Sequence, residues 1–233
     1  MKFDVLPIEP SQTYDWLIKK HYLHRIPSIS YAFGLYDKRV LIGVVTYGTP
    51  LSSTLRKGVA GEQYANIVIE LNRLVINDNS DKNAASFFIG RSLKLLPKPS
   101  IVISYADTAQ GHIGYVYQAT NFIYTGLSAK ITDYVPRGKE NLHHCTISDK
   151  SRGMSNRAQW LKDTYGENLI AIPRSRKHRY VYIVADKITK TQIIKSLNYK
   201  QYPYPKGENF RYDAGGDVPT QQILFNNYDG DQQ

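Results

Sequence analysis

The stretch from Ser100 to Gly126 constrains the fold of this chain most strongly, because it predicts a buried strand, a short loop, a helix and another strand. Ile101 to Ala106 is a continuous apolar run, too short for a helix and rich in β-branched residues, as is typical of a strand covered on both faces. Asp107 follows this strand, and ligands of open α/β sheets gather beyond the carboxyl ends of strands. Asp107 and, in the following helix, Tyr117 are therefore candidate site residues. The alternative is that Asp107 caps a turn and Tyr117 packs in the core.

The elements around this stretch indicate an α/β fold with a mixed central sheet and flanking helices. The pattern predicts a β-hairpin over 29–36 and 40–47, a long strand over 65–76, a helix over 84–96, and strands over 121–127, 131–135 and 180–185. Residues 50–61 have loop composition. Asn156 is expected to cap a helix that ends near Gly166, and Thr189 with Gln192 to form the capping box of another.

A helix is also predicted near the beginning of the chain, with Ser11 as its N-cap. An apolar stripe at helical spacing then places His21 and Tyr22 on the inward face; its members are Tyr14, Leu17, Ile18, His21 and Tyr22. An inward histidine is either a satisfied core residue or a functional one. His24 lies one turn further on, but two histidines without a third ligand are a weak metal signal.

The polar loop 77–83 leads into the helix predicted over 84–96, and a helix start with free N–H groups is an anion site. The candidate residues for binding an anionic cofactor group are Asn77, Lys82, Asn83 and Ser86. Any α/β protein has such helix starts, so an ordinary helix start is the alternative. Glu70 and Arg73 lie in the apolar strand before this loop, where charges must pair or face a cavity. They are either a structural pair or residues that position a substrate.

Positive charge is concentrated in one segment of the chain. The formal net charge is +10, made up of +4 for residues 1–136, +10 for 137–212 and −4 for 213–233. Cations interleaved with tyrosines favour a nucleic-acid surface, although a solvated face is the alternative and RNA would suit it as well as DNA. The candidate DNA contacts are Arg174, Arg176, Lys177, Arg179, Tyr204, Lys206 and Arg211.

This charge division predicts a core over 1–136, a basic extension over 137–212 that packs on the core, and a frayed tail over 213–233. The single cysteine, Cys145, excludes an internal disulfide framework and a multi-thiolate zinc site. No apolar stretch approaches the length of a membrane span. We therefore expect a cytoplasmic protein without membrane contact.

The predicted element order resembles the GNAT acyltransferase fold. The resemblance implies that the pyrophosphate of an acyl-CoA lies on the helix start within 77–86. This stretch lacks the usual glycine-rich pattern of that superfamily, since NSDKNAAS has no glycine. Coenzyme A is then either absent or held by different contacts.

A closer resemblance is to the Mom family of phage DNA-modification proteins. It covers the chain from about Trp16 to Asp213 and is carried by the strings HYLHRIPS, GVVTYGTP, ELNRLVINDNSDKNAASFFIGRSLKLL, SYADTAQGHIGYVYQATNFIYTG, KHRYVYI and YPKGENFRYD. It implies that adenine in double-stranded DNA is converted to N6-carbamoylmethyladenine in the host cell cytoplasm, which protects phage DNA from restriction. It also implies iron and a catalytic and metal-associated set of four residues, which correspond here to His21, Tyr22, Asp107 and Tyr117.

Two other functions stay open at this point. One is an acyl-CoA-dependent N-acyltransferase that acts on a small amine or a protein and has no dependence on DNA. The other is a non-catalytic nucleic-acid-binding protein, whose DNA affinity would survive loss of Asp107 and Tyr117. The donor of a carbamoylmethyl group does not follow from the residues, and either a monomer or a homodimer is compatible with them.

Overall fold

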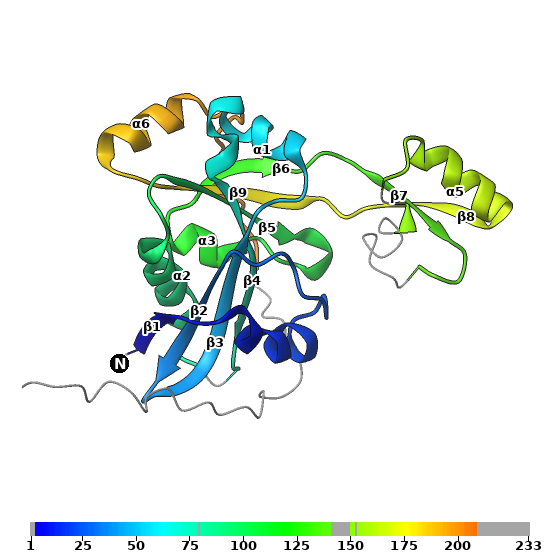
Figure 1. The fold of residues 1–233 in the computed structure, drawn as a ribbon. Helices are drawn as coiled ribbons and strands as arrows, with labels where there is room; N and C mark the ends of the chain where they lie inside the picture. Colours follow the sequence, from blue (N-terminus) through cyan, green and yellow to red (C-terminus); the bar gives the residue numbers. More distant parts are fainter. Residues whose placement is uncertain (1–2, 79, 141–149, 152, 209–233) are drawn as a thin grey trace, which may run out of the picture.

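The computed structural model describes residues 3–78, 80–140, 150–151 and 153–208, and a seven-stranded sheet forms its centre (Figure 1). The strand order across the sheet is β1-β2-β3-β4-β5-β9-β6. The strands span Phe3–Pro7 (β1), Tyr31–Asp37 (β2), Val40–Gly48 (β3), Val68–Ile76 (β4), Ser100–Asp107 (β5), Ile123–Leu127 (β6) and Lys177–Val184 (β9). Neighbouring strands are antiparallel except for β4 and β5, which are parallel. The expected α/β class with a mixed sheet is confirmed.

The two parallel strands separate toward their carboxyl ends. Within the described residues, β4 and β5 pair over Val68–Leu71 and Ile101–Ser104. Beyond these pairs, β4 continues beside β3 to Ile76 and β5 continues beside β9 to Asp107. Because each strand follows its antiparallel neighbour, the sheet opens between them at the end that carries Asp107.

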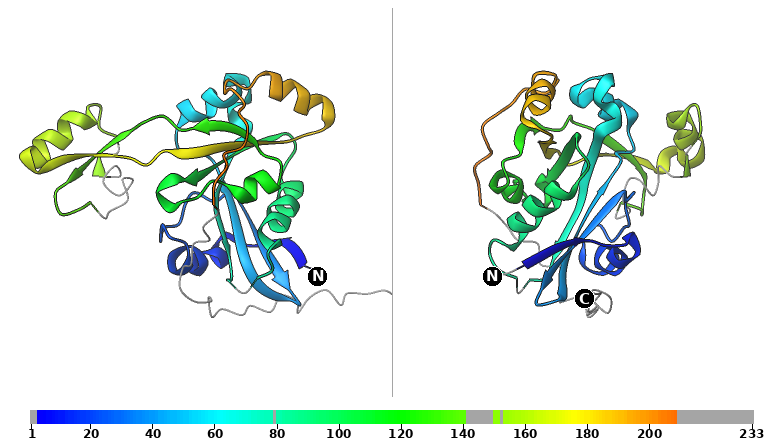
Figure 2. Two further views of the ribbon diagram at one scale, coloured as in Figure 1. Left: turned by 180° about the vertical axis from the view of Figure 1, so that it is seen from behind. Right: turned by 60° about the vertical axis from the view of Figure 1, so that its left-hand side comes forward.

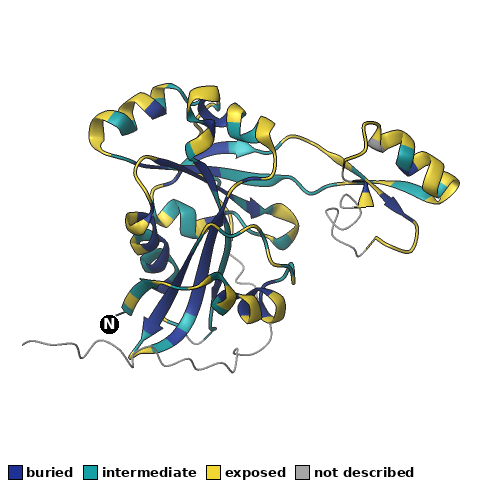
Figure 3. Cartoon of the chain, in the orientation of Figure 1, coloured by how far each residue is buried: buried dark blue, intermediate teal, exposed yellow. Residues whose placement is uncertain are grey.

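Helices cover both faces of the sheet (Figure 2). On one face, α2 (Ala84–Leu95) and α3 (Tyr115–Ala119) pack on a core that includes Val102. On the other, α1 (Ser53–Ala60) and α6 (Lys187–Lys195) pack on a core that includes Ile101 and Ile103. Alternate residues of β5 therefore enter different cores, as expected for a strand that is buried on both faces. Buried residues accordingly concentrate in the sheet, whereas exposed ones follow the outer helix surfaces (Figure 3).

The chain before β2 differs from the predicted helix. A 3₁₀ turn spans Pro10–Thr13 and begins after Glu9, not Ser11, and a π-helical turn spans Trp16–Lys20. In the π turn the N–H of His21 donates to the carbonyl of Trp16, five residues earlier, at 3.1 Å. This wider turn buries Trp16, Leu17, Lys20 and His21, but it leaves Tyr14 and Ile18 of the predicted stripe exposed. The inward position of His21 is confirmed, although the stripe is wrong.

Two other local predictions are wrong for identifiable reasons. Residues 50–61 are not a loop, because the Ser52 side chain accepts a hydrogen bond from the N–H of Leu55 at 3.1 Å and starts α1. Helix α6 begins after Asp186 and not at Thr189, since the Asp186 carboxylate accepts the N–H groups of Ile188 and Thr189. Hydroxyl and carboxylate caps compete at such helix starts, and sequence spacing alone does not rank them.

A small arm projects from the sheet between β6 and β9 (Figure 1). It consists of the antiparallel pair β7 (Thr132–Pro136) and β8 (Leu169–Pro173) and of helix α5 (Arg157–Tyr165), which packs on them around Val135 and Leu161. The predicted Asn156 cap is confirmed, because its side chain accepts the Gln159 N–H at 3.1 Å. The arm is an insertion, since β9 returns to the central sheet. The boundary drawn at residue 136 thus falls at the end of β7, within the arm.

Gly114, immediately before α3, is expected to be the most sensitive glycine near the sheet opening. Its φ is +76°, and an added Cβ would lie 2.4 Å from Cε2 of Tyr180. Gly114→Ala should lower the free energy of unfolding by about 2 kcal/mol or more. Gly90→Ala lies within α2 with nothing within 4 Å of the new Cβ, and it should stabilise by about 0.5–1 kcal/mol. Urea unfolding measures both, and equal effects would contradict the packing of Gly114 on Tyr180.

No helix in the described part of the chain has the length and apolarity that a membrane crossing requires.

Candidate functional site

A cleft of about 710 Å³ occupies the opening between β4 and β5. Its walls come from the second half of β4, the end of β5, the starts of α2 and α3, and the segment just after the π-helical turn. Residues far apart in sequence line it together: His21, Tyr22, Glu70, Arg73, Lys82, Asn83, Ser86, Tyr105, His112, Tyr117 and Lys177. Of the four residues that the Mom resemblance implies for the site, His21, Tyr22 and Tyr117 line this cleft, whereas Asp107 is not among the lining residues.

Asp107 ends β5 beside the cleft and is held by three groups. Its Oδ1 accepts hydrogen bonds from the N–H of Ala109 at 3.0 Å and from the hydroxyl of Ser175 at 2.7 Å. Its Oδ2 lies 3.4 Å from Nζ of Lys177, and 12% of its side chain is exposed. Asp107 therefore caps the 3₁₀ turn Thr108–Gln110, as the alternative proposed, and also fixes the ammonium of Lys177, which lines the cleft.

Three aromatic rings meet on the wall next to Asp107. The rings of His21 and Tyr22 are stacked, with centroids 4.5 Å apart and planes at 26°. The ring of His112 lies at 82° to that of Tyr22, with centroids 6.3 Å apart. His21 is buried, and its Nδ1 accepts the N–H of Leu23 at 3.1 Å. Neutral His21 consequently carries its proton on Nε2.

Glu70 is half-buried and lines the cleft. Burial raises the pKa of Glu70, and the positive charges of Arg73 and then Lys177 oppose that shift. Burial also raises the pKa of Tyr105 and of Tyr117, and the nearby Glu70 charge adds to both shifts. Glu70 and Arg73 both line the cleft, so these charges face a cavity, and their role in positioning a substrate stays a prediction.

Tyr117 joins the cleft to the core. Its ring packs on those of Phe122 and Tyr180, each at a centroid distance of 5.3 Å. A hydrogen bond with Ser104 partly offsets the effect of burial on its pKa. Tyr117 thus packs in the core and also lines the cleft, and its role in the site stays a prediction.

The start of α2 lies along the cleft, as predicted for an anion site. Lys82, Asn83 and Ser86 line the cleft. Asn77 is engaged differently, because its side-chain oxygen accepts from Nζ of the buried Lys20 at 3.3 Å, next to an ion pair of Lys20 with Asp78 at 3.1 Å. Asn77 thus ties the π-helical turn to the loop before α2.

Sequence reasoning did not single out His112 or Tyr105, and it assigned Lys177 to DNA and not to the cleft. His112 lies five residues beyond Asp107, and its N–H donates to the Asp107 carbonyl at 3.1 Å. Its place in the loop that follows the buried strand was the available signal. Lys177 gave no such signal, because its pairing with Asp107 depends on the antiparallel register of β9 on β5.

The arginines predicted to contact DNA already donate hydrogen bonds within the chain. Arg174 forms a two-point ion pair with Asp133, and Arg176 donates to the carbonyls of Ser128 and Leu127. Arg179 donates to Thr125 and lies 3.4 Å from the ring centroid of Tyr199. Tyr204 and Lys206 are exposed, and Arg211 lies outside the described residues. The DNA role of these residues stays a prediction.

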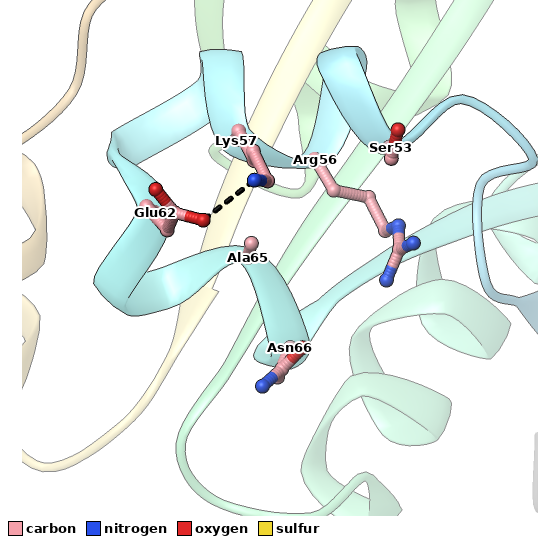
Figure 4. Close-up of a pocket in the computed structure, with 6 residues that line it drawn as sticks. All are labelled: Ser53, Arg56, Lys57, Glu62, Ala65 and Asn66. Atoms are coloured by element: carbon pink, nitrogen blue, oxygen red, sulfur yellow. Dashed lines mark hydrogen bonds and ion pairs between the residues drawn. The ribbon is translucent and has the colours of Figure 1, made fainter.

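A second, smaller hollow of about 160 Å³ lies between α1 and the segment before β4 (Figure 4). Its charged groups include Arg56 and the ion pair of Lys57 with Glu62 at 2.5 Å. None of the predicted site residues lines this hollow.

Comparison with known proteins identifies the family of the chain. The model of the Mom protein family matches residues 2–206. This chain belongs to the Mom family. A curated relative, the methylcarbamoylase Mom of Escherichia phage Mu, is 30% identical over 192 residues, which cover 80% of this chain and 77% of the relative. The resemblance inferred from the sequence is confirmed, and this Mom-family chain is a transferase.

Solved acetyltransferases also align with the Mom-family chain. A putative acetyltransferase from Salmonella typhimurium with acetyl-CoA aligns at a TM-score of 0.43 and 6% identity, over 81% of this chain and 97% of that one. The spermidine/spermine N-acetyltransferase SpeG of Vibrio cholerae aligns at a TM-score of 0.43 and 9% identity, over 82% of this chain and 99% of that one.

Several atoms of the four residues that the Mom resemblance implies for iron already have partners within the chain. Nδ1 of His21 and both carboxylate oxygens of Asp107 have partners within the chain, and the Tyr117 hydroxyl bonds to Ser104. Within the described residues, no group of three or more His, Cys, Asp or Glu side chains is suited to a metal. Iron binding stays a prediction.

The pKa of His21 gives a measurable pH dependence. Burial, with the nearby Arg73 charge, lowers this pKa from 6.5 to about 3. Between these values the unfolded chain binds a proton that the folded chain does not, so the free energy of unfolding should fall as pH drops from 6.5 toward 3. The loss is on the order of 3–5 kcal/mol.

Urea unfolding between pH 7 and pH 4 tests this expectation. His21→Gln should flatten the pH dependence, whereas His24→Asn should change it much less, because the His24 charge is a smaller cause of the lowered His21 pKa than burial. His112 and His178 also have lowered pKa values, so some slope should remain in His21→Gln. An unchanged slope in His21→Gln would contradict the buried, neutral imidazole.

Proposed function

We propose that this protein transfers a carbamoylmethyl group to the N6 amine of adenine in double-stranded DNA. The observation that carries the proposal is membership of the Mom family, with a relative named methylcarbamoylase that aligns over most of both chains. The modified adenine would protect phage DNA from restriction in the host cell cytoplasm. The cleft between β4 and β5 would supply the proton acceptor and the positive charges that this transfer needs.

A nitrogen that forms a bond to carbon must also lose a proton. Glu70 is suited to accept it, because a half-buried carboxyl with a raised pKa is a stronger base than an exposed one. Arg73 and Lys177 line the same cleft and supply positive charge for an anionic leaving group. The new bond joins N6 to the methylene carbon of the donor, and the donor loses its leaving group from that carbon.

The donor end of the cleft is assigned to the start of α2. Lys82, Asn83 and Ser86 line this end, and a helix N-terminus favours anionic groups. The phosphates of coenzyme A or of another donor would fit these contacts. An acyl-CoA thioester would join N6 to its carbonyl carbon, so transfer of a carbamoylmethyl group needs a donor whose leaving group is on the methylene carbon. The same end would serve an acyl-CoA-dependent N-acyltransferase, which would leave an acetyl group and not a carbamoylmethyl group on its acceptor.

The adenine amine is paired inside a duplex, so the base must leave the stack to reach the cleft. Tyr115 lines the cleft and is 55% exposed at the first residue of α3. A large ring at this place is positioned to occupy the gap that a flipped base leaves, as aromatic or apolar wedges do in other DNA-binding proteins.

Among the predicted DNA contacts, Lys206 is the one best placed to bind a DNA phosphate near the cleft. A Cβ added at its neighbour Gly207 would lie 3.6 Å from Cγ2 of Ile113, and the carbonyl of Pro205 accepts a hydrogen bond from Nε2 of Gln118 at 3.4 Å. The exposed Lys206 therefore lies beside the loop that carries His112. Basic residues such as Lys206 would position the duplex without reading its sequence.

Lys206→Ala should weaken DNA binding at low salt and reduce the slope of log K against log salt concentration by about 1. Fluorescence anisotropy of a labelled duplex at several salt concentrations measures this slope. Lys98→Ala, at an exposed position before β5, is the control and should leave the slope unchanged. Equal slopes in wild type and Lys206→Ala would exclude a phosphate contact.

Restriction protection tests the proposed function in cells. Plasmid from cells that express the protein should resist endonucleases whose sites contain adenine, while enzymes with sites of only guanine and cytosine should cut as before. Loss of cutting by both groups would indicate bound protein and not base modification. Full cutting by both would count against adenine modification.

A further inference from the structure

The wall formed by His21, Tyr22 and His112 has the geometry of a binding surface for a planar ring. Tyr22 is half-buried, and one face of its ring lies on His21 with the two planes at 26°. His112 stands nearly perpendicular to Tyr22, at 82°. All three line the cleft.

The backing of this wall is rigid. His21 is 9% exposed, and both the bond of its Nδ1 with the Leu23 N–H and the hydrogen bond of its own N–H with Trp16 fix the ring and backbone. The backbone N–H of His112 donates to the carbonyl of Asp107. A ring that enters the cleft would therefore meet a His21 imidazole that is already in place behind Tyr22, which lowers the entropic cost of binding.

We propose that Tyr22, backed by His21 and flanked by His112, is the platform on which the flipped adenine stacks. This inference rests on the proposed function and deepens it, since it assigns these residues to the substrate base and not to a metal. Aromatic side chains hold unstacked bases through their π faces. A purine on Tyr22 would share the cleft with Glu70, the group assigned to accept the amine proton.

The two assignments of Tyr22 predict different results for one substitution. A metal ligand acts through its phenolate oxygen, which Tyr22→Phe removes. A stacking platform acts through the ring, which Tyr22→Phe keeps and Tyr22→Leu removes. Phe and Leu are both apolar at a half-buried position, so the pair separates ring from hydroxyl while both side chains stay similar in polarity.

Binding to a duplex with 2-aminopurine opposite an abasic site tests the platform. This base is unpaired, so flipping it costs little in any sequence, and its fluorescence reports a change in stacking. The titration is done with added Fe²⁺ and again with chelator, because only the first condition would show the loss of a metal ligand in Tyr22→Phe. Wild type and Tyr22→Phe should agree within about 2-fold in affinity, whereas Tyr22→Leu should lose about 10-fold or more.

Circular dichroism and urea unfolding show whether both variants are folded, and Tyr14→Leu, at an exposed position before the π-helical turn, is the control. The platform is refuted if Tyr22→Phe binds as poorly as Tyr22→Leu, if Tyr22→Leu binds like wild type, or if wild type gives no fluorescence change. Modified adenine in cellular plasmid together with any of these results would overturn the platform alone. Normal stacking without modified adenine would overturn the proposed function.

Discussion

Asp107→Asn is expected to reduce adenine modification by about 100-fold or more while the protein still folds. The asparagine keeps the shape of the side chain but loses the charge that faces Lys177 at 3.4 Å. Lys177 would then no longer be fixed at the wall of the cleft, and misplacement of a reacting partner by about 1 Å can cost 10²-fold in rate. The hydrogen bonds from Ser175 and Ala109 can still reach the remaining carbonyl oxygen, so the stability loss should stay near 1 kcal/mol.

Quantification of modified deoxyadenosine in plasmid from cells that express each variant measures this effect. Asp15→Asn makes the same chemical change at an exposed ion pair with Lys19 and should retain full activity. Activity of Asp107→Asn near that of wild type would reduce Asp107 to a cap of the 3₁₀ turn. Unfolded Asp107→Asn would instead mark the residue as structural.

Glu70→Gln should lower the rate of modification by about 10²- to 10⁴-fold, the usual contribution of a general base. Glutamine retains the volume of the half-buried side chain but cannot accept the amine proton. Because burial raises the pKa of Glu70, the wild-type rate should increase as pH rises through that pKa and then level off. Glu70→Gln should lose this dependence.

Glu62→Gln is the matched control, since Glu62 is exposed and pairs with Lys57 away from the cleft. It should modify DNA like wild type. A normal rate for Glu70→Gln would assign proton removal to another group. A reduced rate that kept the full pH dependence would mean that Glu70 positions the substrate and does not act as the base.

The strands and the site differ in how well sequence predicts them. Ile101 to Ala106 predicts β5 because continuous apolar character is a local property, and Asp107 follows from where the run ends. The π-helical turn was not predictable from the stripe that began at Tyr14, because the i to i+5 hydrogen bond widens the turn and buries Trp16 and Lys20 in place of Tyr14 and Ile18. His21 was still placed correctly, since it lies five residues after Trp16.

Residues whose contacts depend on strand pairing were the ones whose place the sequence did not predict. Lys177 looked like a member of a basic cluster, yet the register of β9 on β5 sets it opposite Asp107. The pairing of β9 with β6 likewise brings Arg179 to Thr125, and its guanidinium lies over the ring of Tyr199. The arm could not be predicted from the sequence either, because β7 comes soon after β6. The insertion between β6 and β9 shows only in the structure, where β9 returns to the central sheet.

Nucleoside mass spectrometry of plasmid from cells that express the protein tests whether this Mom-family chain adds a carbamoylmethyl group to adenine. We expect a deoxyadenosine that carries a carbamoylmethyl group in cells that express the wild-type protein, and its near absence in cells that express Asp107→Asn. Unmodified deoxyadenosine in cells that contain folded, DNA-binding wild-type protein would contradict modification of adenine by this protein. An acetylated deoxyadenosine would show ordinary acyl transfer and not carbamoylmethyl transfer.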